Sequence, residues 1–220
     1  MPTITRTDTA WVFDLGADEN RFSPPWLDSA EDQLGQVAAD PEVLPLITSG
    51  QDKFFSNGLD LEWVLANRDQ FHDYVARTER FLAAVLTLPV PTIAAINGHA
   101  FGAGAMLAMC HDQRVMRTDR GFFCLPEVDL PLPFTPGMQA LLTSTLPAST
   151  ARVAMTTGRR FGGEAAVAAG IVEAAVTIEE LPATAAAMVE GLAGKDAANL
   201  GNIKSALFAE VVAKLGSTAE

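Results

Sequence analysis

Hydrophobic positions along the chain follow two kinds of spacing. Compact runs rich in β-branched residues predict strands, and apolar residues three or four positions apart predict amphipathic helices. The expected strands cover residues 9–15, 43–48, 92–96, 114–117, 121–125 and 171–176. The expected helices cover residues 24–39, 68–87, 105–110, 149–157, 163–169, 179–192 and 196–215, with further helices opening near residues 58 and 138. This alternation predicts an α/β fold with parallel strand pairing.

The clearest helical pattern covers residues 68–87. Side chains suited to a core recur there at helical spacing, at Phe71, Val75, Thr78, Leu82 and Val85. A stripe of this kind predicts one buried face. Pro89 and Pro91 then end the helix and precede the strand at residues 92–96.

Residues 91–112, PTIAAINGHAFGAGAMLAMCHD, combine a strand, a turn of small residues and an apolar helix. The glycines of Gly102-Ala103-Gly104 let the backbone approach another group closely. The first N–H groups of the helix that follows have no helical partners and lie at the positive end of its dipole. The turn is therefore predicted to bind an anion, or an oxygen atom that becomes negatively charged during a reaction.

Composition narrows the functional classes. The 220 residues suffice for one domain with a large core. A formal net charge of −12 argues against a nucleic-acid partner, so an anionic ligand must be held by local donors. Cys110 and Cys124 lie in apolar surroundings and are expected to be buried free thiols. The histidines have no partners at metal-binding spacing, so no metal site is expected.

Membrane and export signals are also weak. No run of residues is long and apolar enough to cross a bilayer. The N-terminal segment shows no basic region followed by an apolar block. We therefore expect a cytoplasmic protein without a membrane partner.

Three blocks of the sequence resemble the crotonase superfamily, the enoyl-CoA hydratase/isomerase family. They are KFFSNGLDL at residues 53–61, the stretch at residues 91–112, and PEVDL at residues 126–130. Within these blocks, the segments SNGLDL, PTIAAINGHA and EVD are most similar to those of the peroxisomal-type Δ3,Δ2-enoyl-CoA isomerases. The resemblance implies a crotonase-like spiral of ββα units over residues 1–178, with a C-terminal helical segment at residues 179–220 for oligomer or CoA contacts. It also implies an acyl-CoA thioester substrate and assembly into homotrimers or hexamers.

The same resemblance assigns residues to the site. The family holds the thioester carbonyl between two backbone N–H groups, an oxyanion hole that falls here on Leu59 and Ala103. The Ala103 assignment agrees with the free N–H groups expected at that turn. Arg21 and Lys204 are candidate partners of the CoA 3′-phosphate. Coenzyme A is part of the substrate, so no separate cofactor is implied. The positions that match the CoA-binding segment are Lys53, Phe55, Asn57, Gly58 and Gly102.

Acidic residues distinguish the reactions of the family. Its hydratases use two glutamates that share a water; Glu127 matches one of them, and Met106 occupies the position of the other. A single carboxylate can move a proton between two carbons of one face. The resemblance therefore implies an isomerase of fatty-acid oxidation that converts 3-enoyl-CoA to trans-2-enoyl-CoA, with Glu127 as acid and base. The alternatives are an enoyl-CoA hydratase, another crotonase-type acyl-CoA reaction, or a CoA-binding member with little turnover.

The surroundings of Glu127 suggest further roles. Its apolar neighbours are expected to raise its pKa. Asp129 is a second candidate acid, because side chains two positions apart share a face in an extended chain; the alternative is a hydrogen-bonding role in a turn. The dienoyl-CoA isomerases carry a further Asp where this chain has Thr135, which disfavours that reaction.

Asp60 is expected to cap the short helix after Leu59.

Overall fold

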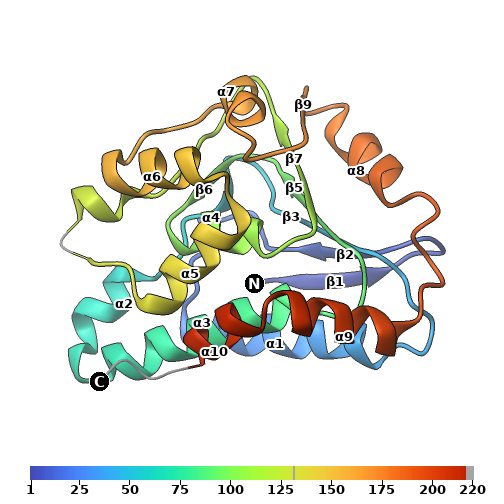
Figure 1. Ribbon diagram of the computed structural model, residues 1–220, viewed down its shortest axis with the longest axis horizontal. Coiled ribbons are helices and arrows are strands. Elements are labelled where there is room, and N and C mark those ends of the chain that lie inside the picture. The colour runs from blue at the N-terminus through green and yellow to red at the C-terminus, as the bar shows by residue number, and fades with distance from the viewer. Residues whose placement is uncertain (131, 217–220) are drawn as a thin grey trace.

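The computed structural model describes residues 1–130 and 132–216. Within these residues the larger sheet has six strands in the order β1-β2-β3-β5-β7-β9 (Figure 1). Neighbouring strands run parallel, except that β1 pairs antiparallel with β2. The predicted α/β class with parallel pairing is therefore confirmed. The strands are β1 (Thr3–Arg6), β2 (Trp11–Asp14), β3 (Leu46–Ser49), β5 (Thr92–Ile96), β7 (Gln113–Arg117) and β9 (Ala174–Val176).

A second sheet contains the short parallel strands β4 (Phe54–Ser56), β6 (His99–Phe101) and β8 (Phe123–Cys124). Each of them directly follows one strand of the larger sheet: β4 follows β3, β6 follows β5, and β8 follows β7. A helix comes after each pair. Successive ββα units therefore wind around the core, which is the spiral that the family resemblance implies.

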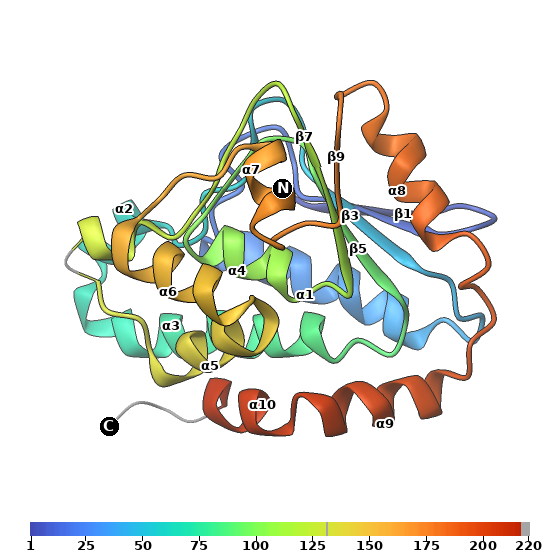
Figure 2. The same cartoon turned by 45° about the horizontal axis from the view of Figure 1, so that its top comes forward.

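Helices cover both sheets (Figures 1 and 2). Short 3₁₀ helices at Arg68–Gln70 and Pro126–Asp129 supplement the α-helices. No helix of the described residues is long and apolar enough to cross a membrane. The α-helices are α1 (Pro24–Ala39), α2 (Leu61–Ala66), α3 (Phe71–Leu86), α4 (Ala103–Met109), α5 (Pro136–Thr145), α6 (Ala148–Thr157), α7 (Gly163–Ala168), α8 (Leu181–Val189), α9 (Ala197–Leu207) and α10 (Ala209–Leu215).

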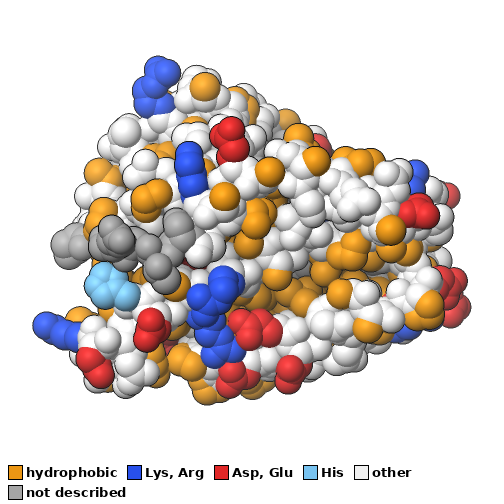
Figure 3. Space-filling view, turned by 60° about the horizontal axis from the view of Figure 1, so that its bottom comes forward, with side chains coloured by type: hydrophobic (Ala, Val, Ile, Leu, Met, Phe, Trp, Pro, Cys, Tyr) orange, Lys and Arg blue, Asp and Glu red, His pale blue; other side chains and the backbone are white. Residues whose placement is uncertain are grey.

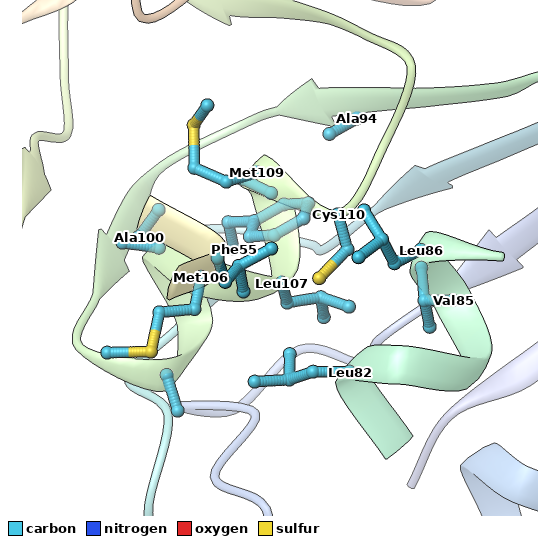
Figure 4. Packing of buried hydrophobic residues seen from close by; sticks show 14 of the residues in the cluster. Phe55, Leu82, Val85, Leu86, Ala94, Ala100, Met106, Leu107, Met109 and Cys110 are labelled. Atoms are coloured by element: carbon cyan, nitrogen blue, oxygen red, sulfur yellow. The ribbon is translucent and has the colours of Figure 1, made fainter. Parts of the chain in front are cut away.

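Strand β5 and helix α4 form the centre of the molecule. Every residue of both elements is buried. A strand covered on both faces has no need for polar alternation, which explains its continuous apolar sequence. Figure 4 shows Leu107 of α4 and Cys110 at its end lying close to Leu82 and Leu86 of α3. The C-terminal half of α4 is therefore anchored by packing on α3.

Several strands were not expected from the sequence. Strand β1 exposes most of its side chains, so it carries no apolar alternation. Strand β4 lies in a segment expected to be a loop, and β6 lies in a segment expected to be a turn. These two strands meet at Gly98, where a Cβ would lie only 2.1 Å from the carbonyl oxygen of Lys53. Their pairing depends on this close backbone approach, which a pattern of apolar residues does not reveal.

The C-terminal region also differs from the expectation. In place of one helix over residues 196–215, α9 and α10 are separated by Phe208, whose φ is −107° and ψ 17°. Helix α10 packs against α3 and α5. On the face in Figure 3, hydrophobic side chains gather along a hollow and charged side chains lie beside it. The division between a core at residues 1–178 and a segment at residues 179–220, of which 217–220 lie outside the described residues, stays a prediction.

Candidate active site

The turn before α4 carries a free backbone N–H group. Gly102 has φ 54° and ψ −124°, a conformation that residues with a side chain rarely adopt. Ala103 is the first residue of α4, so its N–H has no acceptor within the helix. In the described part of the chain this N–H donates no hydrogen bond. It is therefore available to a ligand.

Gly58 brings a second backbone segment against this turn. Its φ is +73°, and a Cβ on Gly58 would lie 2.7 Å from the Ala103 nitrogen and 2.8 Å from the Gly104 nitrogen. Only glycine permits so close an approach. The N–H of the next residue, Leu59, also has no acceptor among residues 1–130 and 132–216. Two N–H groups without partners, from segments far apart in the sequence, thus lie beside each other.

Local contacts hold the segment that contains Leu59. The backbone N–H of Asp60 donates to the hydroxyl oxygen of Tyr74 at 2.8 Å. The Asp60 carboxylate accepts the N–H of Trp63 at 3.1 Å and so caps α2, as expected. Burial raises the pKa of Tyr74 to about 12, which keeps its hydroxyl neutral. The peptide next to the Leu59 N–H is therefore fixed from both α2 and α3.

Glu127 lies beside the same turn. It belongs to the 3₁₀ helix Pro126–Asp129, and its Oε1 is 3.2 Å from the position that a Cβ on Gly102 would take. Its Oε2 is buried and has no hydrogen-bond partner among the described residues. Desolvation raises the pKa of Glu127 to about 7, in the expected direction. A carboxyl group with this pKa suits proton transfer near neutral pH.

These groups share one pocket with a volume of about 430 Å³. Leu59, Gly102, Ala103 and Glu127 all line it. The rest of its wall is mainly apolar and comes from α3, from residues 132–134 and from the start of α5. Among the apolar neighbours of Glu127 in the sequence, Val128 is 52% exposed and so contributes little to its desolvation. The pocket wall supplies most of it. Low polarity around the two N–H groups strengthens their interaction with a developing negative charge.

The second acids considered from the sequence do not join Glu127. Met106 is fully buried and lines the pocket at the position where a hydratase of the family carries a carboxylate. Asp129 is exposed and is not among the residues that line the pocket. The chain is a 3₁₀ turn there, so the expectation that Glu127 and Asp129 share a face is wrong. The Asp129 carboxylate lies instead against Gly158, 2.6 Å from the position of a Cβ on that residue.

The residues predicted to contact CoA fall in different environments. Asn57 and Gly102 line the pocket, and Gly58 lies against the start of α4. The Oδ1 atom of Asn57 is buried without a partner among the described residues. The side chain of Phe55 is fully buried in the core, so it packs rather than facing a ligand, and the predicted contact of this segment with CoA stays a prediction. Lys53 is exposed, and its ammonium lies 5.0 Å from the centre of a neighbouring aromatic ring.

The two candidates for a phosphate contact are already engaged. Lys204 is buried, and its ammonium donates to Asp112 at 2.7 Å and to the carbonyl of Val90 at 2.9 Å. It fastens α9 to the start of β5, so the expectation that it binds a phosphate is wrong. Arg21 forms an ion pair with Glu62 at 2.9 Å and lines a separate open depression. Its role toward CoA stays a prediction.

Two functional groups on α3 were not predicted from the sequence. Tyr74 holds the Asp60 peptide, and Glu79 places a carboxylate in the pocket wall. Glu79 lies four residues after Val75 and thus falls on the apolar stripe of the helix. A carboxylate on such a face is unusual, and that was the available signal.

Other polar groups have structural roles. His99 packs against the rings of Phe101 and Phe122, with ring centres 5.0 Å and 5.7 Å away. Cys110 and Cys124 are buried free thiols, as expected. Across the described residues, no three His, Cys, Asp or Glu side chains come together as metal ligands.

Known relatives and solved structures put this geometry in context. The family model described as "Enoyl-CoA hydratase/isomerase" matches residues 14–219. The chain is 37% identical over 204 residues to "Enoyl-CoA delta isomerase 3" of Arabidopsis thaliana, covering 89% of this chain and 86% of that protein. It is 35% identical to "Enoyl-CoA delta isomerase 2, peroxisomal" of the same plant, with 98% and 95% covered.

The fold is similar to that of solved structures as well. A probable enoyl-CoA hydratase from Mycobacterium tuberculosis H37Rv matches with a TM-score of 0.89 at 22% identity, covering 99% of this chain and 92% of that one. The crotonase-like fold expected from the sequence is therefore confirmed. The isomerase-type relatives likewise confirm the resemblance carried by the three sequence blocks. By sequence and by fold, the chain belongs to the enoyl-CoA hydratase/isomerase family.

Proposed function

We propose that the protein converts 3-enoyl-CoA to trans-2-enoyl-CoA. The thioester carbonyl oxygen accepts hydrogen bonds from the Leu59 and Ala103 N–H groups. Glu127 takes a proton from C2, and the electron pair of that C–H bond passes toward the carbonyl to give a dienolate. Glu127 then returns the proton to C4 as the double bond forms between C2 and C3. The scheme conserves atoms and charge with one carboxyl group as both acid and base.

One observation carries this proposal: a desolvated carboxylate with a free oxygen shares a pocket with two free backbone N–H groups. The N–H groups stabilise charge that develops only during the reaction, so they favour the dienolate over the bound substrate. A pKa of about 7 lets Glu127 both accept and return the proton near neutral pH. The names of the two Arabidopsis relatives, both enoyl-CoA delta isomerases, support the same reaction.

The residue at position 106 supports isomerisation over hydration. A hydratase of the family holds its water between two carboxylates, and Met106 places a thioether where one of them would be. Of the two other carboxylates that line the pocket, Asp73 is exposed at the start of α3, and Glu79 is hydrogen-bonded to the hydroxyl of Thr135. A lone base can still shuttle a proton between two carbons without a positioned water.

The test is a spectroscopic assay that follows conjugated thioester formation from 3-hexenoyl-CoA. Glu127→Gln should lower kcat by about 10²–10⁴, the usual contribution of a positioned acid and base. Asp129→Asn is the matched control, because it removes a carboxylate two residues away that lies outside the pocket, and it should leave the rate within about twofold. Full activity of Glu127→Gln would contradict the role of Glu127. Hydration of 2-hexenoyl-CoA as fast as isomerisation would contradict the proposed reaction.

A further inference from the structure

Glu79 is a buried carboxylate in the wall of the same pocket, outside the proposed reaction. Only 4% of its surface is exposed. Its Oε1 accepts a hydrogen bond from the hydroxyl of Thr135, and both residues line the pocket. The carboxylate fits under the first turn of α5 because Gly137 has no side chain: a Cβ there would lie 2.6 Å from Oε1. The structure thus reserves space for this group.

Exposure along α3 shows which end of the pocket Glu79 occupies. His72 and Asp73 line the pocket at the start of the helix and are exposed. Val75 and Glu79 line it further along and are buried. At 1.5 Å of rise per residue, Glu79 lies about 9 Å further along the helix axis than Asp73. Glu79 therefore belongs to the inner part of the pocket, away from its exposed rim.

The role of Thr135 leaves Glu79 with unused acceptor capacity. The Thr135 oxygen already accepts the N–H of Met138 at 3.1 Å, so α5 has its N-terminal cap without Glu79. A carboxylate offers about four lone-pair sites, of which the Thr135 hydroxyl occupies one. Burial raises the pKa of Glu79 because the apolar wall disfavours its charged form. A plain alkyl chain packed here would desolvate the group further without giving it a donor.

We propose that Glu79, oriented by Thr135, is a specificity-determining residue that favours acyl chains carrying a hydroxyl group over plain alkyl chains of the same length. A hydroxyl on the chain donates to the carboxylate oxygen that has no donor among the described residues. A site built to hydrogen-bond a hydroxyl discriminates strongly against the analogue without one, since its own polar group is then left without a partner. This inference rests on the proposed function in one respect, that the pocket holds the acyl chain of an acyl-CoA.

The test compares pairs of substrates that differ by one hydroxyl. The pairs are 3-hexenoyl-, 3-octenoyl- and 3-decenoyl-CoA, each with its terminally hydroxylated counterpart, because chain length sets how deep the hydroxyl reaches. For at least one pair, the wild-type enzyme should show a kcat/KM about tenfold higher for the hydroxylated chain, as expected for a hydrogen bond to a carboxylate. No preference at any of the three lengths would overturn the inference.

Variants test whether Glu79 causes the preference for hydroxylated chains. Glu79→Leu should reduce it to within about twofold, and Glu79→Gln, which keeps a weaker acceptor, should retain about threefold. Glu164→Leu is the matched control, because Glu164 is exposed on α7 and outside the pocket, and it should keep the wild-type preference. An unchanged preference in Glu79→Leu would overturn the inference. Should that variant fail to fold, Glu79→Gln and the wild-type comparison decide the matter. Loss of hydration of 2-enoyl-CoA in Glu79→Gln would also overturn it, by making Glu79 a catalytic residue.

A binding measurement separates this inference from the proposed reaction. Calorimetry with octanoyl-CoA and 8-hydroxyoctanoyl-CoA needs no turnover, and the hydroxylated ligand should bind about tenfold tighter to the wild type. If this difference disappears in Glu79→Leu while the wild type isomerises neither 3-octenoyl-CoA nor its hydroxylated counterpart, the reaction is wrong and the role of Glu79 stands. If isomerisation is present and neither binding nor kcat/KM depends on the hydroxyl, the reaction stands and the role of Glu79 is wrong.

Discussion

Lys204 is a buried ionisable group and Glu127 a half-buried one with a buried oxygen, and the protein surrounds them differently. The Lys204 ammonium donates to Asp112 and to the carbonyl of Val90. Glu127 keeps a buried carboxylate oxygen without a partner among the described residues. Burial shifts both groups toward their neutral forms, lowering the pKa of Lys204 and raising that of Glu127 to about 7. A buried charge with partners fastens two elements together, whereas one without them remains available for chemistry.

The largest effect on stability should come from removing Lys204, the buried charge that has hydrogen-bonding partners. Lys204→Met leaves Asp112 without its counter-charge and frees α9 from the start of β5. We expect a loss of about 2–4 kcal/mol in the free energy of unfolding, below the upper range for buried pairs because Asp112 is partly exposed. Urea unfolding measures it. Lys195→Met, which removes an exposed lysine near the same helix, should change stability by less than about 0.5 kcal/mol. Equal stabilities of the two variants would show that Lys204 does not fasten α9 to the start of β5, and the contrast with Glu127 would be wrong.

The pH dependence of the reaction tests the other half of the comparison. The base form of Glu127 is its carboxylate, which is lost as pH falls through about 7. The kcat/KM for 3-hexenoyl-CoA should therefore approach a tenfold fall per pH unit well below 7, which gives about a 50-fold fall between pH 7 and pH 5, and level off above pH 8. An apparent pKa near 4.5, measured in buffers of constant ionic strength, would show that the free enzyme solvates this carboxyl after all.

A smaller effect should appear in the stability of Glu127→Gln. The carboxyl of the folded protein holds its proton up to about pH 7, whereas in the unfolded chain it ionises near 4.5. Between these values folding binds a proton, so the free energy of unfolding of the wild type falls as pH rises. Above pH 7 the folded protein carries the full penalty of burying an ionised carboxylate. Glutamine has no such cost. The variant should match the wild type at pH 4 and exceed it by about 1–3 kcal/mol at pH 8.

Urea midpoints at these two pH values measure that difference. Asp129→Asn, at an exposed carboxyl two residues away, should show no comparable gain at pH 8. A Glu127→Gln variant that is less stable than the wild type at both pH values would mean that the carboxylate has hidden partners. The loss of activity and the gain of stability should thus come from the same substitution.

The sequence predicted best where one local pattern sufficed. Strand β5 and the cap at Asp60 follow from short-range signals, and both are confirmed. Helix α4 was also expected, but it begins at Ala103, two residues before the predicted start. The direction of the pKa shift of Glu127 was also predicted, although the apolar wall of the pocket, formed by distant segments, contributes to it. Strands β4 and β6 could not be predicted in this way, because their pairing depends on a close backbone contact at Gly98 rather than on a run of apolar side chains.

Long-range partners could not be predicted from local patterns. Lys204 looks like a surface cation, yet it is buried against Asp112, far away in the sequence. Glu79 falls on a stripe predicted to be core, and only its position beside the start of α5 makes it part of a pocket wall. Asp129 was placed on the wrong face because a 3₁₀ turn changes the direction of successive side chains.

The contact between Gly58 and the start of α4 has a consequence for redesign. The two free N–H groups are held in place by backbone against backbone, in a space where no side chain fits. The wall that faces the acyl chain comes from other elements, α3 and the start of α5. Substitutions in that wall can therefore change the shape and polarity of the pocket without moving the two N–H groups that are proposed to stabilise the enolate. Substrate preference and chemistry can be altered separately in this scaffold.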